Sequence, residues 1–207
     1  VIGNVEFDHA DIYADLEAVV TAFRRLVTLV PRRGLVLLGF DSPHARGLAD
    51  WVRSRVQTFG TDPGADWYAY DLKPDGSWTH FSVRHAGQAI GTFSIPLVGS
   101  YNVRNALAAL AVAVEVGVEP AAVNEAFGRF LGVKRRLEVV GEAAGVTVYD
   151  DFAHHPTAVA ETLAGLRAAH PESRIWAVFE PRSASSCRRV FQSDFARAFG
   201  AADEVVL

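Results

Sequence analysis

The sequence is poor in sulfur-containing residues and in lysine: it has no methionine, one cysteine and only two lysines. A single cysteine excludes an internal disulfide framework and is typical of a protein in the reducing cytoplasm. The apolar runs are far shorter than the about 20 residues that span a bilayer, and no signal peptide is visible. The net charge is -4 without a basic block, which argues against nucleic acid or an anionic membrane surface as a partner. We therefore expect a cytoplasmic protein that binds neither.

The absence of methionine also means that the chain contains no natural start residue. It begins on Val1-Ile2 and ends on the apolar run 205–207, and such β-type runs are poor natural termini. We expect an internal piece of a longer protein. Half of the 207 residues are hydrophobic, which is enough for one large domain or two small ones.

The first third of the chain alternates helical and strand patterns. Residues 15–30 have apolar residues at helical spacing, and 35–38 is a continuous apolar run of the kind found in buried parallel strands. Residues 66–96 then contain three short alternating runs separated by turn sequences, which predict an antiparallel meander. These patterns predict an α/β layer with the meander added to it.

The last third reads as strand, strand, helix, strand, helix, strand. This order predicts the first half of a Rossmann-like unit. Between the two parts, residues 131–133 are typical of a linker, so we expect a domain boundary near Gly132. The predicted domains are residues 1–132 and residues 133–207.

A strand-to-helix junction at residues 149–157 carries two carboxylates and two histidines before Pro156. Ligands of α/β sheets bind at the carboxyl ends of strands, which makes Asp151 and His154 candidate site residues; the alternative is a helix cap with two surface histidines. Arg182 follows the predicted strand 175–179, and we expect it at the same sheet edge. An arginine there suits bidentate capture of a carboxylate or phosphate, unless it is an ordinary exposed loop residue.

Two further clusters have polar side chains with binding potential. His9 lies among carboxylates after the first apolar run, where it can bind or position a divalent cation, although a helix-initiating turn explains the same residues. Asn102 and Asn105 are three residues apart in the first turn of a predicted helix and share a face. Paired amides can present a donor and an acceptor to the edge of a base such as adenine.

Four motifs, taken together and in order, resemble the Mur ligases, ATP-dependent amide-forming enzymes of peptidoglycan metabolism. Each motif alone is weak, but the resemblance covers essentially the whole chain. It implies the end of a central ATPase domain with an antiparallel meander, followed by the first half of a Rossmann-like C-terminal domain. The motifs are Asn-Val-Glu-Phe-Asp-His-Ala-Asp (4–11), Tyr-Asn-Val-Arg-Asn-Ala-Leu-Ala-Ala (101–109), Lys-Arg-Arg-Leu-Glu (134–138) and Asp-Asp-Phe-Ala-His-His-Pro-Thr (150–157).

The resemblance also implies cofactors and residue roles. ATP and Mg²⁺ are the expected cofactors, and the chemistry is phosphorylation of a muramoyl carboxylate to an acyl phosphate, which an amine then attacks. Positioning and offsetting of phosphoryl charge supply much of such a rate. The implied roles are Mg²⁺ ligation by His9, adenine binding by Asn102 and Asn105, contact with ATP phosphates or ribose by Arg136, ribose binding by Asp151, and contact with the reacting substrates by His154 and Arg182.

Within the family, the Glu-Phe-Asp-His-Ala-Asp-Ile form and the Glu-Pro-Arg-Ser turn look most like the murein-recycling branch. That branch joins the tripeptide L-Ala-γ-D-Glu-meso-diaminopimelate to UDP-N-acetylmuramate, and these are the expected partners. The alternatives are the branch that adds L-alanine to UDP-N-acetylmuramate and, from another class, a non-catalytic α/β module that binds a nucleotide or a partner. The sequence predicts no particular oligomeric state.

Two features depart from the family pattern. No Gly-x-x-x-x-Gly-Lys-[Ser/Thr] loop occurs, so the phosphate loop and the UDP-binding domain are expected upstream of Val1. Some Mur ligases carry a carbamoylated lysine after the Asp-His motif, whereas the helix here has Arg24 and Arg25. We therefore expect that this chain by itself does not turn over ATP.

Overall fold

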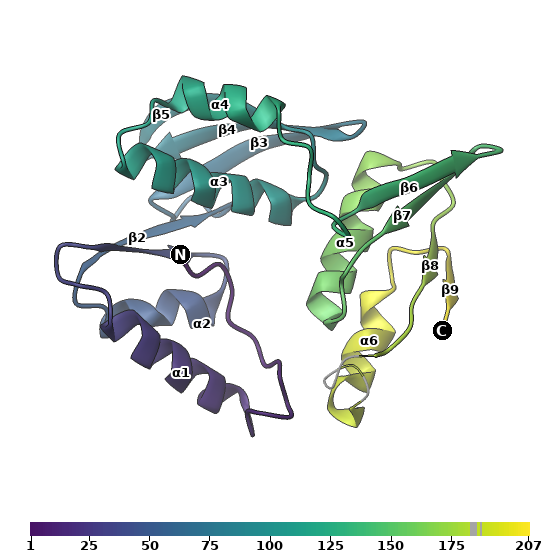
Figure 1. The fold of residues 1–207 in the computed structure, drawn as a ribbon, viewed down its shortest axis with the longest axis horizontal. Coiled ribbons are helices and arrows are strands. Elements are labelled where there is room, and N and C mark those ends of the chain that lie inside the picture. The colour runs from purple at the N-terminus through teal and green to yellow at the C-terminus, as the bar shows by residue number, and fades with distance from the viewer. Residues whose placement is uncertain (183–185, 187) are drawn as a thin grey trace.

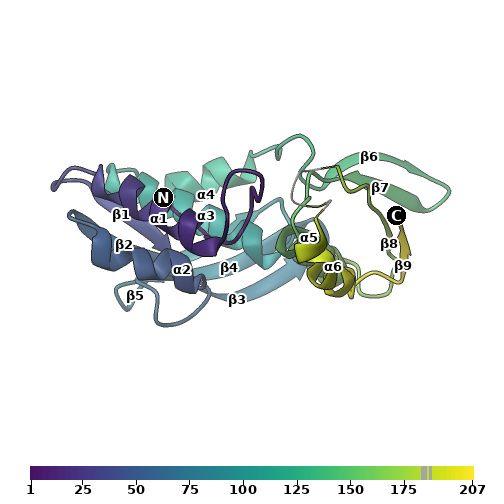
Figure 2. The ribbon, with the colours of Figure 1, turned by 90° about the horizontal axis from the view of Figure 1, so that it is seen from below.

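The computed structural model describes residues 1–182, 186 and 188–207. Cys187 and the serine of the Glu-Pro-Arg-Ser turn, Ser183, lie outside the described residues. The described residues form two units that lie side by side in Figure 1 and Figure 2. We call residues 1–128 the N-terminal unit and residues 138–207 the C-terminal unit; residues 129–137 connect them. The α/β fold class predicted from the sequence is confirmed.

The N-terminal unit is built on one mixed sheet with the strand order β1-β2-β3-β4-β5. The pairs β1-β2 and β2-β3 are parallel, whereas β3, β4 and β5 form an antiparallel meander. The predicted meander is therefore confirmed, and it continues the α/β sheet. The bounds are β1 (Leu35–Gly39), β2 (Arg55–Gly60), β3 (Trp67–Asp75), β4 (Trp78–His85) and β5 (Gln88–Ile95).

Helices cover both faces of this sheet. Val36 and Leu38 of β1 belong to the core under α1, and the intervening Leu37 belongs to the core under α3. Burial on both faces explains the continuous apolar run in β1, because neither face meets water. No helix among the described residues is long and apolar enough to cross a membrane. The helices of this unit are α1 (Leu16–Thr28), α2 (Pro43–Arg46), the 3₁₀ helix η1 (Gly47–Trp51), α3 (Ser100–Glu115) and α4 (Pro120–Gly128).

The C-terminal unit begins with an antiparallel hairpin and continues with two helices that pack against each other. Its small core joins α5, α6 and the strand β8 through Val159, Leu163 and Ala198. The last two strands, β8 and β9, pair in parallel. The elements are β6 (Glu138–Ala143), β7 (Val146–Asp150), α5 (Pro156–Ala169), β8 (Trp176–Val178), η2 (Arg189–Phe191), α6 (Gln192–Ala198) and β9 (Glu204–Val206).

One expectation about this unit is wrong. Among the described residues, β6-β7 and β8-β9 are two separate two-stranded sheets, so Asp151 and Arg182 do not lie at one common sheet edge. A cavity of about 900 Å³ lies between the hairpin and β8 and is lined by residues of both. Each strand keeps the predicted type, but the hydrogen bonds that would join β7 to β8 are not made.

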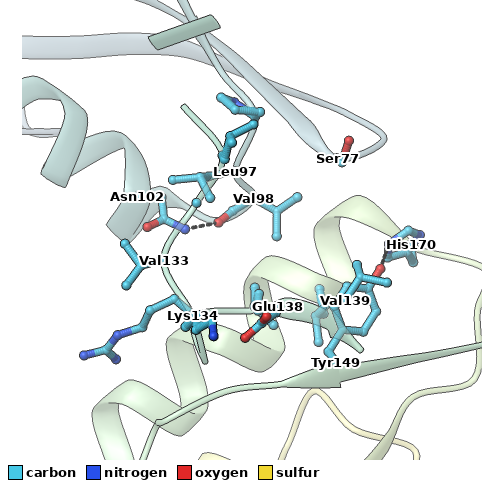
Figure 3. A pocket seen from close by; sticks show the side chains of 16 residues that line it. Ser77, Leu97, Val98, Asn102, Val133, Lys134, Glu138, Val139, Tyr149 and His170 are labelled. Carbon is cyan, nitrogen blue, oxygen red and sulfur yellow. Dashed lines mark hydrogen bonds between the residues drawn. The ribbon is translucent and has the colours of Figure 1, made fainter. Parts of the chain in front are cut away.

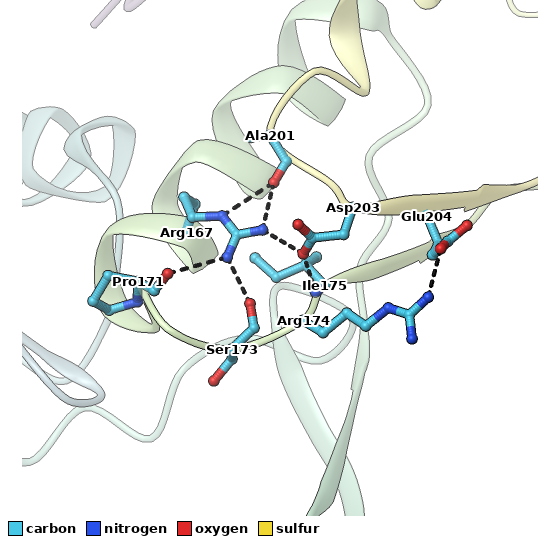
Figure 4. Close-up of polar contacts among 8 residues, drawn as sticks. All are labelled: Arg167, Pro171, Ser173, Arg174, Ile175, Ala201, Asp203 and Glu204. Atoms are coloured by element: carbon cyan, nitrogen blue, oxygen red, sulfur yellow. Dashed lines mark hydrogen bonds and ion pairs between the residues drawn. The ribbon is translucent and has the colours of Figure 1, made fainter.

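The end of α5 is tied to the beginnings of β8 and β9 by Arg167 (Figure 4). Its guanidinium donates to the carbonyls of Ser173 and Ala201 at 2.6 and 3.2 Å and to the Asp203 carboxylate at 2.5 Å. The same carboxylate oxygen accepts the backbone N–H of Ile175 at 2.7 Å. Arg167 thus satisfies carbonyls that the turn would otherwise leave without partners.

We expect Asp203→Asn to destabilise the protein at neutral pH and to have little effect in acid. The Ile175 N–H, followed by Arg167, lowers the pKa of Asp203 below its ordinary value of 3.8. A lowered carboxyl pKa contributes stability above the ordinary value, and that contribution is lost as the pH falls through the folded-state pKa. Urea unfolding at a series of pH values checks this.

Asp194→Asn is the matched control, because Asp194 pairs with Arg197 on the exposed side of α6. Its effect should be small at every pH, as for other exposed ion pairs. An Asp203→Asn effect that is unchanged between neutral and acidic pH would contradict the assignment of the stability to the charged carboxylate.

Candidate functional site

A cavity of about 450 Å³ lies where the two units meet (Figure 3). The N-terminal unit contributes the end of the meander and the first turn of α3, and the connecting segment and the hairpin contribute the opposite wall. Two cationic side chains, from Lys134 and Arg136, and one carboxylate, from Glu138, line it. The excess of positive charge suits an anionic ligand.

Asn102 brings an amide into this cavity from α3. The helix begins at Ser100 after Gly99, whose φ of 92 requires a residue without a Cβ. The Asn102 Nδ2 donates to the Val98 carbonyl at 2.8 Å, which fixes the side chain through its donor end, and the amide oxygen lies on the other side in Figure 3. Asn105, one turn further along, is exposed and does not line the cavity. Of the predicted amide pair, the structure therefore places only Asn102 in this cavity.

Arg136 is presented by a tight loop between Val133 and Glu138. Two residues of the loop, Arg135 and Leu137, have φ values of 58 and 49, which non-glycine residues seldom adopt. Three bonds hold this conformation: the N–H of Arg136 donates to the Val133 carbonyl at 3.1 Å, that of Arg135 to the Glu138 carboxylate at 2.9 Å, and that of Leu137 to Asp151 at 2.8 Å.

The two adjacent arginines share one neighbour and differ in another. Both guanidinium groups lie over the Phe152 ring, at 5.1 Å for Arg135 and 5.7 Å for Arg136. Arg135 also pairs with Asp150 at 3.3 Å, whereas Arg136 lines the cavity. Their sequence neighbourhood is almost identical, so this division comes from the loop conformation. It supplies a matched pair for mutagenesis.

Asp151 uses both carboxylate oxygens inside the protein. One oxygen accepts from the N–H of Leu137, and the other accepts from the N–H of Ala153 at 2.8 Å and from the Thr162 hydroxyl at 3.4 Å. Asp151 therefore connects the Arg136 loop to the start of α5. It lines the 900 Å³ cavity beside this site, and its predicted ribose contact stays a prediction.

Tyr101 connects the two units behind the cavity. Burial raises the pKa of its hydroxyl above the ordinary value of 10.0, and the nearby Asp151 charge raises it further, while a hydrogen bond with Thr162 of α5 lowers it. The hydroxyl thus stays protonated over the physiological range. Next to it, Arg104 of α3 pairs with Glu161 of α5 at 3.2 Å.

The two histidines of the 150–157 motif have different partners. His154 packs edge-on against Phe152 at 5.1 Å, with Nδ1 3.1 Å from the carbonyl of Phe152. His155 instead reaches the other unit, with Nε2 3.1 Å from the carbonyl of Phe7. The sequence placed both in one motif but carried no signal for which of them spans the units.

His9 lies in the segment before α1, far along the chain from the cavity residues. Its φ is 49, and its side chain is 66% exposed with Nε2 4.0 Å from Asp8. The described residues contain no group of three or more His, Cys, Asp or Glu side chains that could hold a metal by themselves. Mg²⁺ is usually bound by one or two protein carboxylates and completes its shell with phosphate oxygens and water, and Asp8 beside His9 could supply one such carboxylate. The predicted ligation of Mg²⁺ by His9 stays a prediction.

Arg182 follows β8 and is exposed. Its side chain is 79% exposed and lies 3.7 Å from Glu180, and it lines neither of the two cavities. This geometry matches the alternative given above for Arg182, an ordinary exposed loop residue. Its predicted contact with a reacting substrate stays a prediction.

Sequence reasoning missed several residues of the site. Tyr149 and His170 line the cavity with Tyr149 Oη and His170 Nε2 3.2 Å apart (Figure 3), and burial raises the pKa of Tyr149. Lys134 belongs to the motif 134–138, but the sequence assigned it no role. For His170, at the end of α5, the sequence offered no signal, because its position depends on the packing of α5 under the hairpin.

Two family models match the chain. The model described as Mur ligase middle domain matches residues 1–113, and the model described as Mur ligase, glutamate ligase domain matches residues 135–207. The chain belongs to the Mur ligase family. Residues 114–134, between the two matches, contain α4 and most of the segment that connects the units.

Curated Mur ligases of two kinds are similar to the chain. The UDP-N-acetylmuramate–L-alanine ligase of Desulfitobacterium hafniense is 37% identical over 100% of this chain and 45% of its own length. The UDP-N-acetylmuramate–L-alanyl-gamma-D-glutamyl-meso-2,6-diaminoheptandioate ligase of Escherichia coli is 41% identical over 100% of this chain and 45% of its own length. The chain thus spans less than half the length of these relatives.

Solved structures of both kinds of Mur ligase are also similar to the chain. The UDP-N-acetylmuramate-alanine ligase of Thermotoga maritima superposes with a TM-score of 0.76 at 25% identity, covering 98% of this chain and 43% of that one. The murein peptide ligase of Psychrobacter arcticus superposes with a TM-score of 0.63 at 30% identity, covering 99% of this chain and 42% of that one.

Proposed function

We propose that the chain forms part of an ATP-dependent ligase that joins L-alanine to UDP-N-acetylmuramate through an acyl phosphate. The observation that carries this proposal is the cavity in which Asn102 of one unit and Arg136 of the connecting loop meet. An amide and a guanidinium on opposite walls suit the two ends of a nucleotide, a base and its phosphates.

The choice of L-alanine over the tripeptide comes from the relatives. L-alanine ligases at 37% and 39% identity come from Desulfitobacterium hafniense and Salinibacter ruber. The L-alanine ligase structure also superposes with the higher TM-score, 0.76 against 0.63. The comparisons thus favour the branch that adds L-alanine over the recycling branch that the motifs had suggested.

Residue roles follow from the family chemistry and stay proposals. We assign adenine to Asn102, which lines the cavity, and the ATP phosphates or ribose to Arg136. A contact of Asn105 with adenine stays a prediction. Asp151 would hold the Arg136 loop and reach the ribose, and His154 and Arg182 would face the reacting substrates. Cations near the transferred phosphoryl group offset its developing charge.

Mg²⁺ fits at His9 with Asp8 as a second ligand. When bound, it would supply charge neutralisation at the phosphates. The phosphates also need a glycine-rich loop, which no stretch of the 207 residues provides. We propose that residues outside this chain supply that loop, and that the enzyme is cytoplasmic.

A second candidate is the ligase for the tripeptide, because the Escherichia coli relative with that specificity is 41% identical. Phosphate release by the full-length protein, with ATP, Mg²⁺ and UDP-N-acetylmuramate, separates the two. A higher kcat/KM for L-alanine supports the main proposal, and a higher value for the tripeptide replaces it with the second. If neither L-alanine nor the tripeptide leads to phosphate release, the result would favour the non-catalytic nucleotide-binding module.

We expect Arg136→Gln to raise the KM for ATP about tenfold, since a hydrogen bond to a charged group contributes about 1.5–3 kcal/mol. Arg135→Gln is the matched control: it removes the same charge one residue away, where the guanidinium pairs with Asp150 and does not line the cavity. Its KM should stay within about twofold of wild type. Equal effects of the two variants would show that only overall charge matters and would refute the Arg136 assignment.

A further inference from the structure

The segment that carries His9 is hydrogen-bonded to the N-terminal unit at its start. Ile2 pairs with β1, donating to the Leu37 carbonyl and accepting from Gly39, both at 2.8 Å. Val5 is buried and its N–H donates to the Ser42 hydroxyl at 3.3 Å. Beyond Val5 the chain leaves the sheet, and α1 begins at Leu16. In between, Phe7 and Tyr13 pack against the core of the N-terminal unit.

His155 of the C-terminal unit holds the next part of this segment. Its Nε2 lies 3.1 Å from the Phe7 carbonyl, and its Nδ1 lies 3.2 Å from a carboxylate oxygen of Glu6. The side chain is only 16% exposed. The Phe7 contact joins residues 148 positions apart, and both contacts are made at the residues directly before Asp8 and His9.

The donors and acceptors around the His155 ring indicate which of its nitrogens carries a proton. A carbonyl oxygen only accepts, so Nε2 carries a proton and donates to Phe7. A ring that also donates from Nδ1 holds Glu6 as well, whereas a ring protonated on Nε2 alone can accept the Thr157 N–H at 3.4 Å and cap α5. The Phe7 bond is kept in both forms, so the link to the segment does not depend on the cap.

Aromatic packing supports the same link. The His155 ring lies edge-on to Phe191, with centroids 5.4 Å apart, and Phe191 stacks on Phe7 at 5.7 Å. Phe191 is 5% exposed. A buried ring packed against both His155 and Phe7 lowers the local dielectric constant around their contact, which strengthens the hydrogen bond.

We propose that His155 is a positioning residue, which sets the place of the Asp8–His9 segment relative to the start of α5. The inference deepens the proposed function and rests on it where Mg²⁺ is concerned. Through this link, the segment that carries His9 is held next to the motif that carries Asp151 and His154 only while the units are closed on each other.

Hydrogen exchange of the full-length protein tests the link without any activity. The N–H groups of Ile12 and Tyr13 donate to the His9 carbonyl at 2.8 and 2.9 Å, so their exchange reports on the order of this segment. We expect His155→Ala to speed exchange in residues 6–13 about fivefold, the effect of losing one hydrogen bond. Glu6→Ala should do the same to a smaller extent while leaving the α5 cap in place.

Arg104→Gln is the matched control, because it breaks the Arg104–Glu161 pair between the same two units away from the segment. Exchange in residues 6–13 should stay at the wild-type rate in this variant. The proposal is overturned if His155→Ala changes exchange only in α5, which would leave His155 as a helix cap. It is also overturned if the effects of His155→Ala and Glu6→Ala on exchange simply add in the double variant. The effects of two residues that contact each other are not additive.

Activity supplies a second readout. In phosphate release, His155→Ala should raise the Mg²⁺ concentration for half-maximal rate about fivefold, with the KM for ATP within about twofold of wild type. Should the wild-type protein release no phosphate, the proposed function fails, and the exchange result alone decides whether His155 positions the segment. A raised KM for ATP with unchanged Mg²⁺ dependence would contradict the positioning role.

Discussion

Replacement of Gly39 by alanine is expected to lower the free energy of unfolding by about 3 kcal/mol, at the upper end of overpacking effects. A Cβ on Gly39 would lie 1.9 Å from the carbonyl oxygen of Gly3 and 2.8 Å from its carbonyl carbon. The neighbouring atoms are backbone and cannot rotate away. The strand end also cannot retreat freely, because the Gly39 N–H donates to the Ile2 carbonyl at 2.8 Å.

Gly47→Ala is the control for this prediction. No atom lies within 4 Å of a Cβ built at Gly47, which sits in a helical conformation with φ -65, so alanine there should be neutral or slightly stabilising. Urea unfolding of both variants measures the difference. A loss below about 1 kcal/mol for Gly39→Ala would mean that the segment before Gly3 yields easily. It would then be no firm anchor for the chain that leads to His9.

The second large effect is expected at the contact between the two units. A Cβ on Gly165 of α5 would meet the Cα of Gly99 at 3.0 Å and its nitrogen at 3.4 Å. Valine there should push α5 away from the start of α3 and disfavour the closed arrangement by about 2 kcal/mol. Since the nucleotide cavity needs both walls, the smaller population of the closed arrangement reduces the apparent affinity for ATP about 30-fold.

Isothermal titration of the full-length protein with a non-hydrolysable ATP analogue measures this affinity. Gly128→Val is the matched control, because Gly128 lies in α4 with no atom within 4 Å of its added Cβ. Both variants place a β-branched residue in a helix and carry the same change in propensity. Only Gly165→Val should weaken binding; equal affinities would show that the cavity does not depend on the approach of Gly99 to Gly165.

The sequence by itself determined the elements and the loop chemistry. Apolar spacing predicted α1 and β1, and turn sequences predicted the meander, because periods of 3.6 and 2 decide which residues share a face. The four motifs identified the family before any geometry was available. The sequence also placed Arg136 and Asp151 in motifs, and the structure joins these motifs through the Leu137 N–H.

Only the tertiary structure decided which motif residues meet. Asn102 lines the cavity and Asn105 does not, although the two share a helix face. His155 rather than His154 contacts the N-terminal unit, and β7 and β8 lie in separate sheets. The physical reason is common to all three: each outcome depends on contacts between residues far apart in the chain, and such contacts leave no local pattern in the sequence.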